Sequence, residues 1–248
     1  MTILTVVQDV CVDVGVVQPT SIFSGLTANR TMQEMLGVAN EMAQRISYDT
    51  RDWTRLRAVA THVGDGVVVP PPPAAGGKMT GTTAFDLPAN YKRMLLTSNL
   101  WRTNFTQTPM KFVPDTDEWL IRRARGSIDG VGEWTILGGQ IHVYPVLPAG
   151  HTVYYTYLDK NCVALAGGGY GDRFLNDADT FVVDERLLKL GMIWQWRAKK
   201  GSPYAEDMGT YSDAILNLMG KDQPAPIIYG RGNMSGHPSY GGPGPWPL

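Results

Sequence analysis

The chain has 248 residues, of which 43% are hydrophobic and 18% are charged, and its formal net charge is −1. This length allows one large domain or two small ones with a sizeable core. A nearly neutral chain has no global field that would draw it to nucleic acid or to an anionic membrane. The two cysteines, Cys11 and Cys162, form no CxxC motif, which argues against a disulfide scaffold or a thiolate metal site.

Targeting signals are not evident in the sequence. No stretch approaches the roughly 20 consecutive apolar residues of a membrane-spanning helix. The first ten residues, MTILTVVQDV, lack the basic region of a signal peptide and reach Asp9 early. We therefore expect a protein that is synthesised in the cytoplasm and does not contact a membrane.

The first 57 residues are predicted to form helices. Residues 2–15 carry valines and isoleucine at a spacing of three and four, which favours a helix. Residues 31–46 continue with an amphipathic pattern, and Thr31 with Glu34 matches a capping box at its start. Trp53 follows as a predicted core residue.

Residues 58–165 have the pattern of a β-rich module. The Pro/Gly run at 70–81 cannot lie inside a sheet and is predicted to be an exposed loop. At 132–145, GEWTILGGQIHVYP, two apolar runs flank a Gly-Gly pair and predict a hairpin. Asp115 is predicted to cap a short helix. Because the strands look like consecutive hairpins without crossover helices, we expect an antiparallel sheet.

Residues 166–221 contain a predicted helical hairpin. Apolar residues at helical spacing precede Lys199, Lys200 and Gly201, which are typical of a helix C-terminus. Ser202 and Pro203 then match the start of a second helix. Two helices joined by so short a loop run antiparallel and bury their apolar faces together.

The apolar residues of this hairpin point in more directions than one partner helix can bury. We therefore expect a neighbouring subunit to pack against them. The aromatic residues assigned to this subunit packing are Trp194, Trp196, Tyr204 and Tyr211.

Residues 222–248 contain six prolines and six glycines among 27 residues. Such a segment cannot bury enough apolar surface to fold alone. It nevertheless carries large apolar side chains, so we interpret it as an extended arm that orders against a partner; a disordered tail is the alternative. The arm residues expected to dock are Ile227, Ile228, Tyr229, Tyr240 and Trp246.

Together these patterns predict an α+β fold. It consists of a bundle of about four helices, an inserted antiparallel β-rich module and an extended C-terminal arm. The predicted parts are 1–57 for the first helices, 58–165 for the module, 166–221 for the hairpin that completes the bundle, and 222–248 for the arm.

The sequence carries no recognisable signature of catalysis, so we expect neither an enzyme nor a bound metal or cofactor. Gly77-Lys78 lacks the earlier glycine and the following Ser or Thr of a phosphate-binding loop. The four histidines are scattered, with no HExxH motif. Arg122, Arg123 and Arg125 form the only basic concentration. They are interpreted as a solvated face or subunit salt bridges, or alternatively as a surface that meets phosphate.

Three segments carry a resemblance to a known family. They are TTAFDLPANYKRM at 82–94, GEWTILGGQIHVYP at 132–145, and the stretch from DTFVVDERLL to YSDAI at 179–215. With the order of helices, β module, helical hairpin and arm, residues 1–220 resemble the head-to-tail adaptor (connector) proteins of tailed bacteriophages, which include the tail tubular proteins.

The resemblance implies a structural virion protein at the portal–tail junction. It would form a ring, expected to hold twelve subunits, that docks on the portal protein, extends the DNA channel and gives the tail or nozzle protein its attachment platform. Contact with DNA passing through the channel would be non-specific at most. The alternative function is a receptor- or glycan-binding tail module, suggested by the Trp- and Tyr-rich strands; a cell-wall hydrolase lacks a recognisable site.

Overall fold

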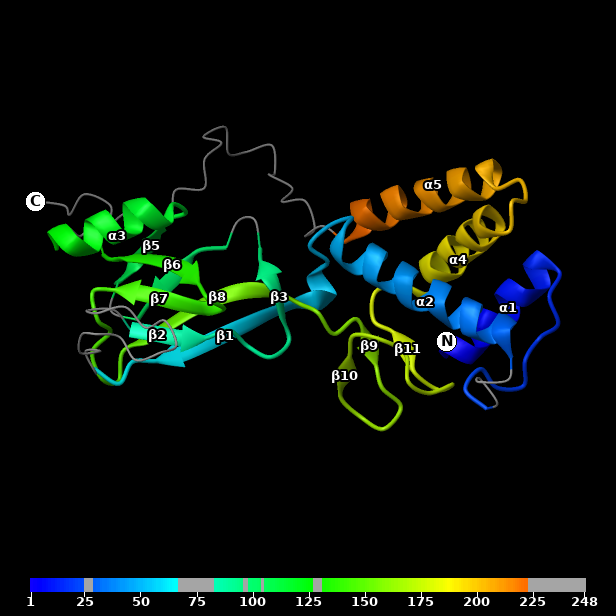
Figure 1. The fold of residues 1–248 in the computed structure, drawn as a ribbon, viewed down its shortest axis with the longest axis horizontal. Coiled ribbons are helices and arrows are strands. Elements are labelled where there is room, and N and C mark those ends of the chain that lie inside the picture. Colours follow the sequence, from blue (N-terminus) through cyan, green and yellow to red (C-terminus); the bar gives the residue numbers. More distant parts are fainter. Residues whose placement is uncertain (25–28, 67–82, 96–97, 104, 127–130, 223–248) are drawn as a thin grey trace, which may run out of the picture.

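The computed structural model describes residues 1–24, 29–66, 83–95, 98–103, 105–126 and 131–222. Figure 1 shows an elongated molecule with a β-sheet body at one end and a helical body at the other. The helices are α1 (Ile3–Val14), α2 (Arg30–Tyr48), α3 (Thr116–Arg125), α4 (Glu185–Lys199) and α5 (Ala205–Lys221). Of these, α3 lies in the sheet body and the other four form the helical body.

Eight strands form the sheet body, in the order β1-β8-β4-β5-β6-β7-β2, with β3 also paired to β8. They are β1 (Arg57–Val63), β2 (Thr83–Asp86), β3 (Tyr91–Met94), β4 (Leu100–Arg102), β5 (Phe105–Phe112), β6 (Glu133–Leu137), β7 (Gln140–Tyr144) and β8 (Thr152–Asp159). The sheet is nearly closed, because the ring of His62 on β1 stacks on that of Phe85 on β2 with centroids 4.8 Å apart.

A three-stranded sheet connects the sheet body to α4. It is made of β9 (Val163–Ala164), β10 (Tyr170–Gly171) and β11 (Thr180–Phe181). The loops around it are organised by the buried carboxylate of Asp179, which accepts backbone N–H bonds from Ala166, Leu175 and Asn176 at 2.7–2.8 Å. Asp179 therefore orders this connection.

The predicted fold class is wrong. The chain is a mixed α/β protein in which a large, nearly closed sheet of eight strands stands beside the helices, and it is not a helical bundle that carries a small β module. The physical reason is that the strands bury a core of their own, so they do not depend on the helices for their apolar contacts. That core includes Leu100, Trp134, Ile141, Val143 and Tyr155.

The expectation of a purely antiparallel sheet is also wrong. β5 and β6 pair in parallel, with Lys111 opposite Glu133 and Phe112 opposite Trp134. Parallel neighbours need a crossover connection, and the short helix α3 supplies it. The prediction that Asp115 caps this helix is confirmed, since its carboxylate accepts the N–H groups of Asp117 and Glu118.

Helix α4 occupies the centre of the helical body and packs against α1, α2 and α5. Gly191 on α4 permits this close approach. A Cβ there would lie 2.5 Å from the Met42 methyl group and 3.2 Å from the ring of Tyr211. The packing of three helices around one, rather than a self-contained hairpin, explains why α4 is buried on several faces.

Two predicted helix starts differ from the structure. Asn29, not Thr31, caps α2, and its side-chain oxygen accepts the N–H of Met32 at 3.2 Å. Helix α5 begins at Ala205 without a side-chain cap, so Ser202 lies in the connecting turn. The helical spacing located both helices, whereas the caps depend on loop geometry that the spacing does not encode.

Candidate functional site

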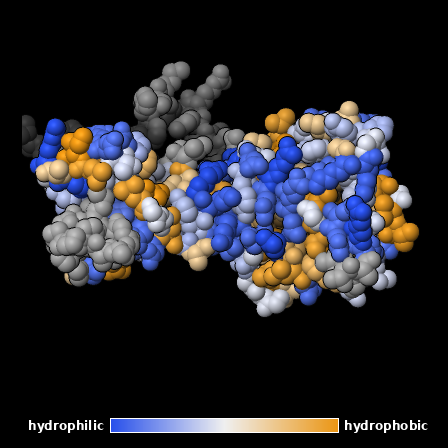
Figure 2. Space-filling model, viewed as in Figure 1, coloured by the Kyte–Doolittle hydropathy of each residue, from blue (hydrophilic) through white to orange (hydrophobic). Residues whose placement is uncertain are grey.

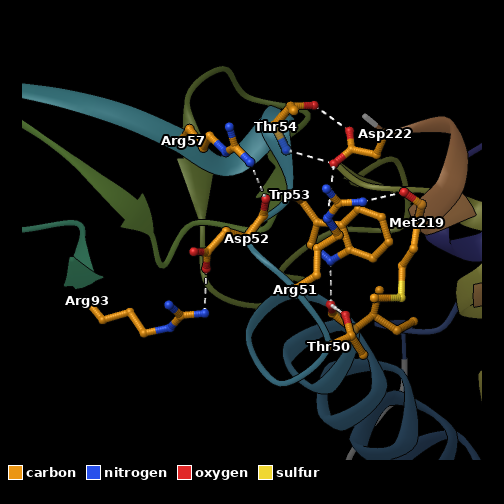
Figure 3. Close-up of polar contacts among 10 residues, drawn as sticks. Thr50, Arg51, Asp52, Trp53, Thr54, Arg57, Arg93, Met219 and Asp222 are labelled. Carbon is orange, nitrogen blue, oxygen red and sulfur yellow. Dashed lines mark hydrogen bonds and ion pairs between the residues drawn. The ribbon is translucent and has the colours of Figure 1, made fainter. Parts of the chain in front are cut away.

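The candidate site is the joint between the two bodies, residues 49–57, which links the end of α2 to β1 (Figure 3). Trp53 lies at its centre and is only 1% exposed, which confirms it as a core residue. Its indole N–H donates to the carbonyl of Ile46 at 2.6 Å. This bond satisfies one of the last carbonyls of α2, which lack partners within the helix, and fixes the joint to that helix.

The end of α5 is attached to the same joint. One carboxylate oxygen of Asp222 accepts the backbone N–H of Thr54 at 3.1 Å, and the other accepts the Thr54 hydroxyl. Arg51 donates to the carbonyl of Met219 and lies 3.9 Å from the Asp222 carboxylate. We call Arg51, Thr54 and Asp222 the arm anchor, because residue 223 follows directly after it.

The joint is fastened to the sheet body as well. Arg93 of β3 makes an ion pair with Asp52 at 2.5 Å. Arg57, the first residue of β1, donates to the Asp52 carbonyl at 3.1 Å. Because both bodies and the end of α5 bond to residues 51–57, the start of the C-terminal segment has a fixed position between the two bodies.

A second contact between the bodies is made by Tyr48 at the end of α2. Its hydroxyl donates to the carbonyl of Lys160, in the connection that follows β8. Burial, and then the neighbouring Cys162, raise the pKa of the Tyr48 phenol far above its ordinary value. The phenol therefore stays protonated and remains a donor at physiological pH.

A groove runs from the arm anchor along α4 and α5. Its larger part, of about 350 Å³, lies between the first turn of α4 and the second half of α5, and its smaller part, of about 170 Å³, lies beside Asp222. Asp184, Leu218 and Lys221 line both parts. Charged side chains of both signs line the groove.

The docking residues assigned to the arm, Ile227, Ile228, Tyr229, Tyr240 and Trp246, lie outside the described residues. What the structure supplies is the point from which this segment departs. Sequence reasoning did not find the arm anchor, because Arg51, Thr54 and Asp222 belong to no motif and meet only through the fold.

The residues assigned to subunit packing are mostly buried within the chain. Trp194, Trp196 and Tyr211 are at most 9% exposed, whereas Tyr204 is 42% exposed. The Trp194 ring lies 6.0 Å from that of Tyr211, and the guanidinium of Arg45 lies over it at 5.3 Å. The argument that a neighbouring subunit must cover these residues is therefore wrong for the three buried ones, because α1, α2 and α5 enclose α4.

The basic concentration on α3 makes salt bridges within the chain. Arg122 contacts Glu133 at 2.6 Å and Glu118 at 2.6 Å, and Arg123 pairs with the other oxygen of Glu133. Arg123 is also enclosed by aromatic rings, with its guanidinium 3.4 Å from the ring centroid of Tyr144. A phosphate-binding role does not fit Arg123, since its side chain is 7% exposed and paired. Arg125, next to the helix end, is exposed.

Within the described residues, no group of three or more His, Cys, Asp or Glu side chains is placed to hold a metal ion. The same part of the chain contains no helix that is long and apolar enough to cross a membrane. The joint itself is distinguished by a buried anchor residue, by attachment to both bodies and by its bonds to Asp222 at the end of α5.

The chain was compared with models of known protein families and with curated proteins, and neither comparison gives a match.

Proposed function

We propose that this chain is a structural subunit of a virion, a head-to-tail adaptor that assembles into a ring of about twelve copies, a number implied by the resemblance. The ring would dock on the portal protein, extend the DNA channel and provide the attachment platform for the tail or nozzle protein. Contact with DNA would be limited to non-specific contact in the channel. The arguments are the resemblance of residues 1–220 to that class and the following physical observation.

The observation that carries the proposal is the arm anchor. Asp222 is bonded to Thr54 and lies beside Arg51, so the aromatic-bearing segment after it starts at a defined place between two bodies. A segment that binds a partner by ordering loses conformational entropy on binding. Fixing one end reduces the volume that the segment explores and so raises its effective concentration at a nearby partner surface.

The test is a truncation after Asp222. We expect the shortened protein to keep the melting temperature of the full chain, because it retains every described residue of both hydrophobic cores. Its affinity for purified portal rings of the same virus should fall at least tenfold in sedimentation assays. The matched point variant is Asp222→Ala, which keeps the whole segment and releases its anchor; we expect it to bind with intermediate affinity.

Two results would overturn the proposal. One is portal binding by the truncated protein as tight as that of the full chain. The other is a full-length protein that stays monomeric both alone and when mixed with portal rings, as judged by native mass spectrometry and electron microscopy.

A further inference from the structure

The groove beside the arm anchor follows one face of α5. The residues of α5 that line it recur at intervals of three and four, so they form one stripe along the helix: Thr210, Asp213, Ala214, Asn217, Leu218 and Lys221. At a rise of about 1.5 Å per residue, the stripe is about 16 Å long. The start of α4, with Asp184, Arg186 and Leu187, forms the other wall.

The groove has an apolar base and a polar rim. Leu187 at the base is 2% exposed, and Ala214 and Leu218 are half-buried against the helical core. Arg186 and Asp213 are exposed at the rim. In Figure 2, apolar and polar side chains lie close together along the upper edge of the helical body, where Figure 1 places α5. An apolar lining with a few polar groups that fix orientation is typical of a binding site.

The C-terminal segment starts at one end of this groove. Asp222 lines the smaller part of the groove, and its carboxylate is held by Thr54. Pro224 and Pro226 follow in the sequence. A proline lacks the N–H group that a helix interior needs, and it favours an extended conformation for the residue before it. The sequence therefore predicts that the chain leaves α5 here and continues in an extended form from the end of the groove.

The first residues of the segment match the groove in chemistry and in length. Residues 223–230, QPAPIIYG, carry no charged side chain and include Ile227, Ile228 and Tyr229. An extended chain covers about 3.3 Å per residue, so residues 224–230 cover about 23 Å. This length spans the stripe of α5 and leaves a margin for a reversal of chain direction after Asp222.

We propose that residues 224–230 of this chain occupy the groove and run back along α5, with the two isoleucines and Tyr229 on its apolar base. The occupant is the same chain rather than a second copy, because the anchored end of the segment already lies in the groove. A short tether from Asp222 gives the segment an effective concentration on the order of millimolar. A second copy does not reach this concentration in dilute solution.

The occupied groove adds a regulatory step to the adaptor function proposed above, and this consequence rests on that function. Ile227, Ile228 and Tyr229 are among the residues assigned to portal docking. The groove holds them until the portal surface competes for them. Tyr240 and Trp246 lie further along the chain than the groove extends, so they are the residues that make the first contact with the portal.

Limited proteolysis of the native full-length protein tests whether the groove is occupied. Chymotrypsin cleaves after tyrosine, and Tyr229 and Tyr240 are both followed by glycine. A synthetic peptide of residues 223–248 supplies the ratio of the two cleavage rates in a free chain. We expect the rate after Tyr229, relative to that after Tyr240, to be at least tenfold lower in the protein than in the peptide. Equal ratios in the protein and the peptide, measured by mass spectrometry of the first products, would overturn the inference.

Disulfide formation tests which face of α5 the segment follows. In full-length Thr210→Cys/Gly230→Cys protein, one new thiol lines the groove and the other ends the proposed segment. The matched control is Met208→Cys/Gly230→Cys, since Met208 is 45% exposed on the same helix and lies outside the residues that line the groove. The native thiols, Cys11 and Cys162, are buried, and burial raises the pKa of both. We expect at least ten times more intramolecular disulfide in the first variant than in the control.

Two results of the cross-linking would contradict the proposal. Equal yields in the two variants would show that the segment does not prefer the groove. Disulfide-linked dimers that exceed the intramolecular product, and that increase with protein concentration, would show that the segment of a second copy occupies the groove.

The outcomes also separate this inference from the proposed function. Slow cleavage after Tyr229 in a protein that never binds portal rings would keep the groove contact and reject the adaptor function. Portal binding that requires the segment, together with cleavage after Tyr229 at the ratio of the free peptide, would reject the groove contact and keep the function.

Discussion

Glu133 is the acidic partner of two arginines in the basic cluster of α3. Its side chain is fully buried at the start of β6 and accepts from two arginines of α3. A buried carboxylate is tolerated only when its charge is paired and hydrogen-bonded. Two of the three arginines that suggested a phosphate surface, Arg122 and Arg123, therefore hold the crossover helix on the sheet.

Replacing Glu133 gives a prediction at this scale. Glu133→Gln removes the charge with little change in shape and leaves Arg123 buried without a counter-ion. We expect a loss of about 3–5 kcal/mol in the free energy of unfolding, measured by urea denaturation. The double variant Arg123→Met/Glu133→Gln should recover part of that loss because no buried charge remains unpaired. Unchanged stability of the single variant would show that water reaches this pair.

At the scale of elements, the contact that closes the sheet among the described residues is made by side chains of β1 and β2. β1 and β2 end the strand order, and His62 joins them by stacking on Phe85 and on Tyr155, whose ring centroids lie at 4.8 and 5.8 Å. Burial lowers the pKa of His62, and the nearby carboxylate of Asp86 partly opposes this effect. The contact between β1 and β2 is therefore more stable when the imidazole of His62 is neutral.

This preference predicts a pH dependence of stability. Since the pKa of His62 is lower in the folded than in the unfolded chain, the unfolded state binds more protons once the pH falls below about 6.5, the ordinary histidine value. Stability is therefore full above that pH and is lost as the pH falls through the lowered pKa. We expect the melting temperature to decrease as the pH falls below about 6.5, and the decrease to be smaller for His62→Phe, which keeps the stacked ring.

The pH window separates this effect from that of carboxylates. The pKa values of Glu34 and Glu41 are lowered by their lysine partners from a starting value of 4.5, so those groups titrate at more acidic pH. An identical pH profile for wild type and His62→Phe would contradict the assignment to His62.

At the scale of the whole molecule, two hydrophobic cores are connected through β8, the residue after β3 and the joint; Met94 of β3 packs against the sheet core, and Leu95 belongs to the helical core. β8 passes from one to the other, since Val153, Tyr155 and Tyr157 belong to the sheet core and Leu158 to the helical core. The joint around Trp53 makes the third connection. Two cores with so few shared residues need not unfold together.

We therefore predict two overlapping transitions in scanning calorimetry. Leu100→Ala in the sheet core and Met42→Ala in the helical core each remove a fully buried side chain, which costs about 2–5 kcal/mol. Leu100→Ala should lower one transition by several degrees and Met42→Ala the other. The contrary result would be a single transition with equal calorimetric and van't Hoff enthalpies. If both variants lowered that transition by the same amount, the joint would couple the two bodies into one cooperative unit.

The sequence by itself determined the features that depend on local spacing. Helical periodicity located α1, α2, α4 and α5, and the Gly138-Gly139 pair located the β6–β7 hairpin, in which Leu137 lies opposite Gln140. Asp115 was identified as a cap because its bonds span only three residues. Such features are set by neighbours in the chain, so their signal is present in a short window.

Only the tertiary structure decided how these elements combine. Four features bring together residues that are distant in the sequence, and no local pattern predicts that they meet. These features are the parallel pairing of β5 with β6, the central place of α4, the Glu133 salt bridges and the arm anchor. The short strands β3 and β4 belong to the same group, because they are stabilised by their pairing with β8, which is distant in the sequence. Long-range pairing energy, rather than local propensity, gives this chain its second core and its joint.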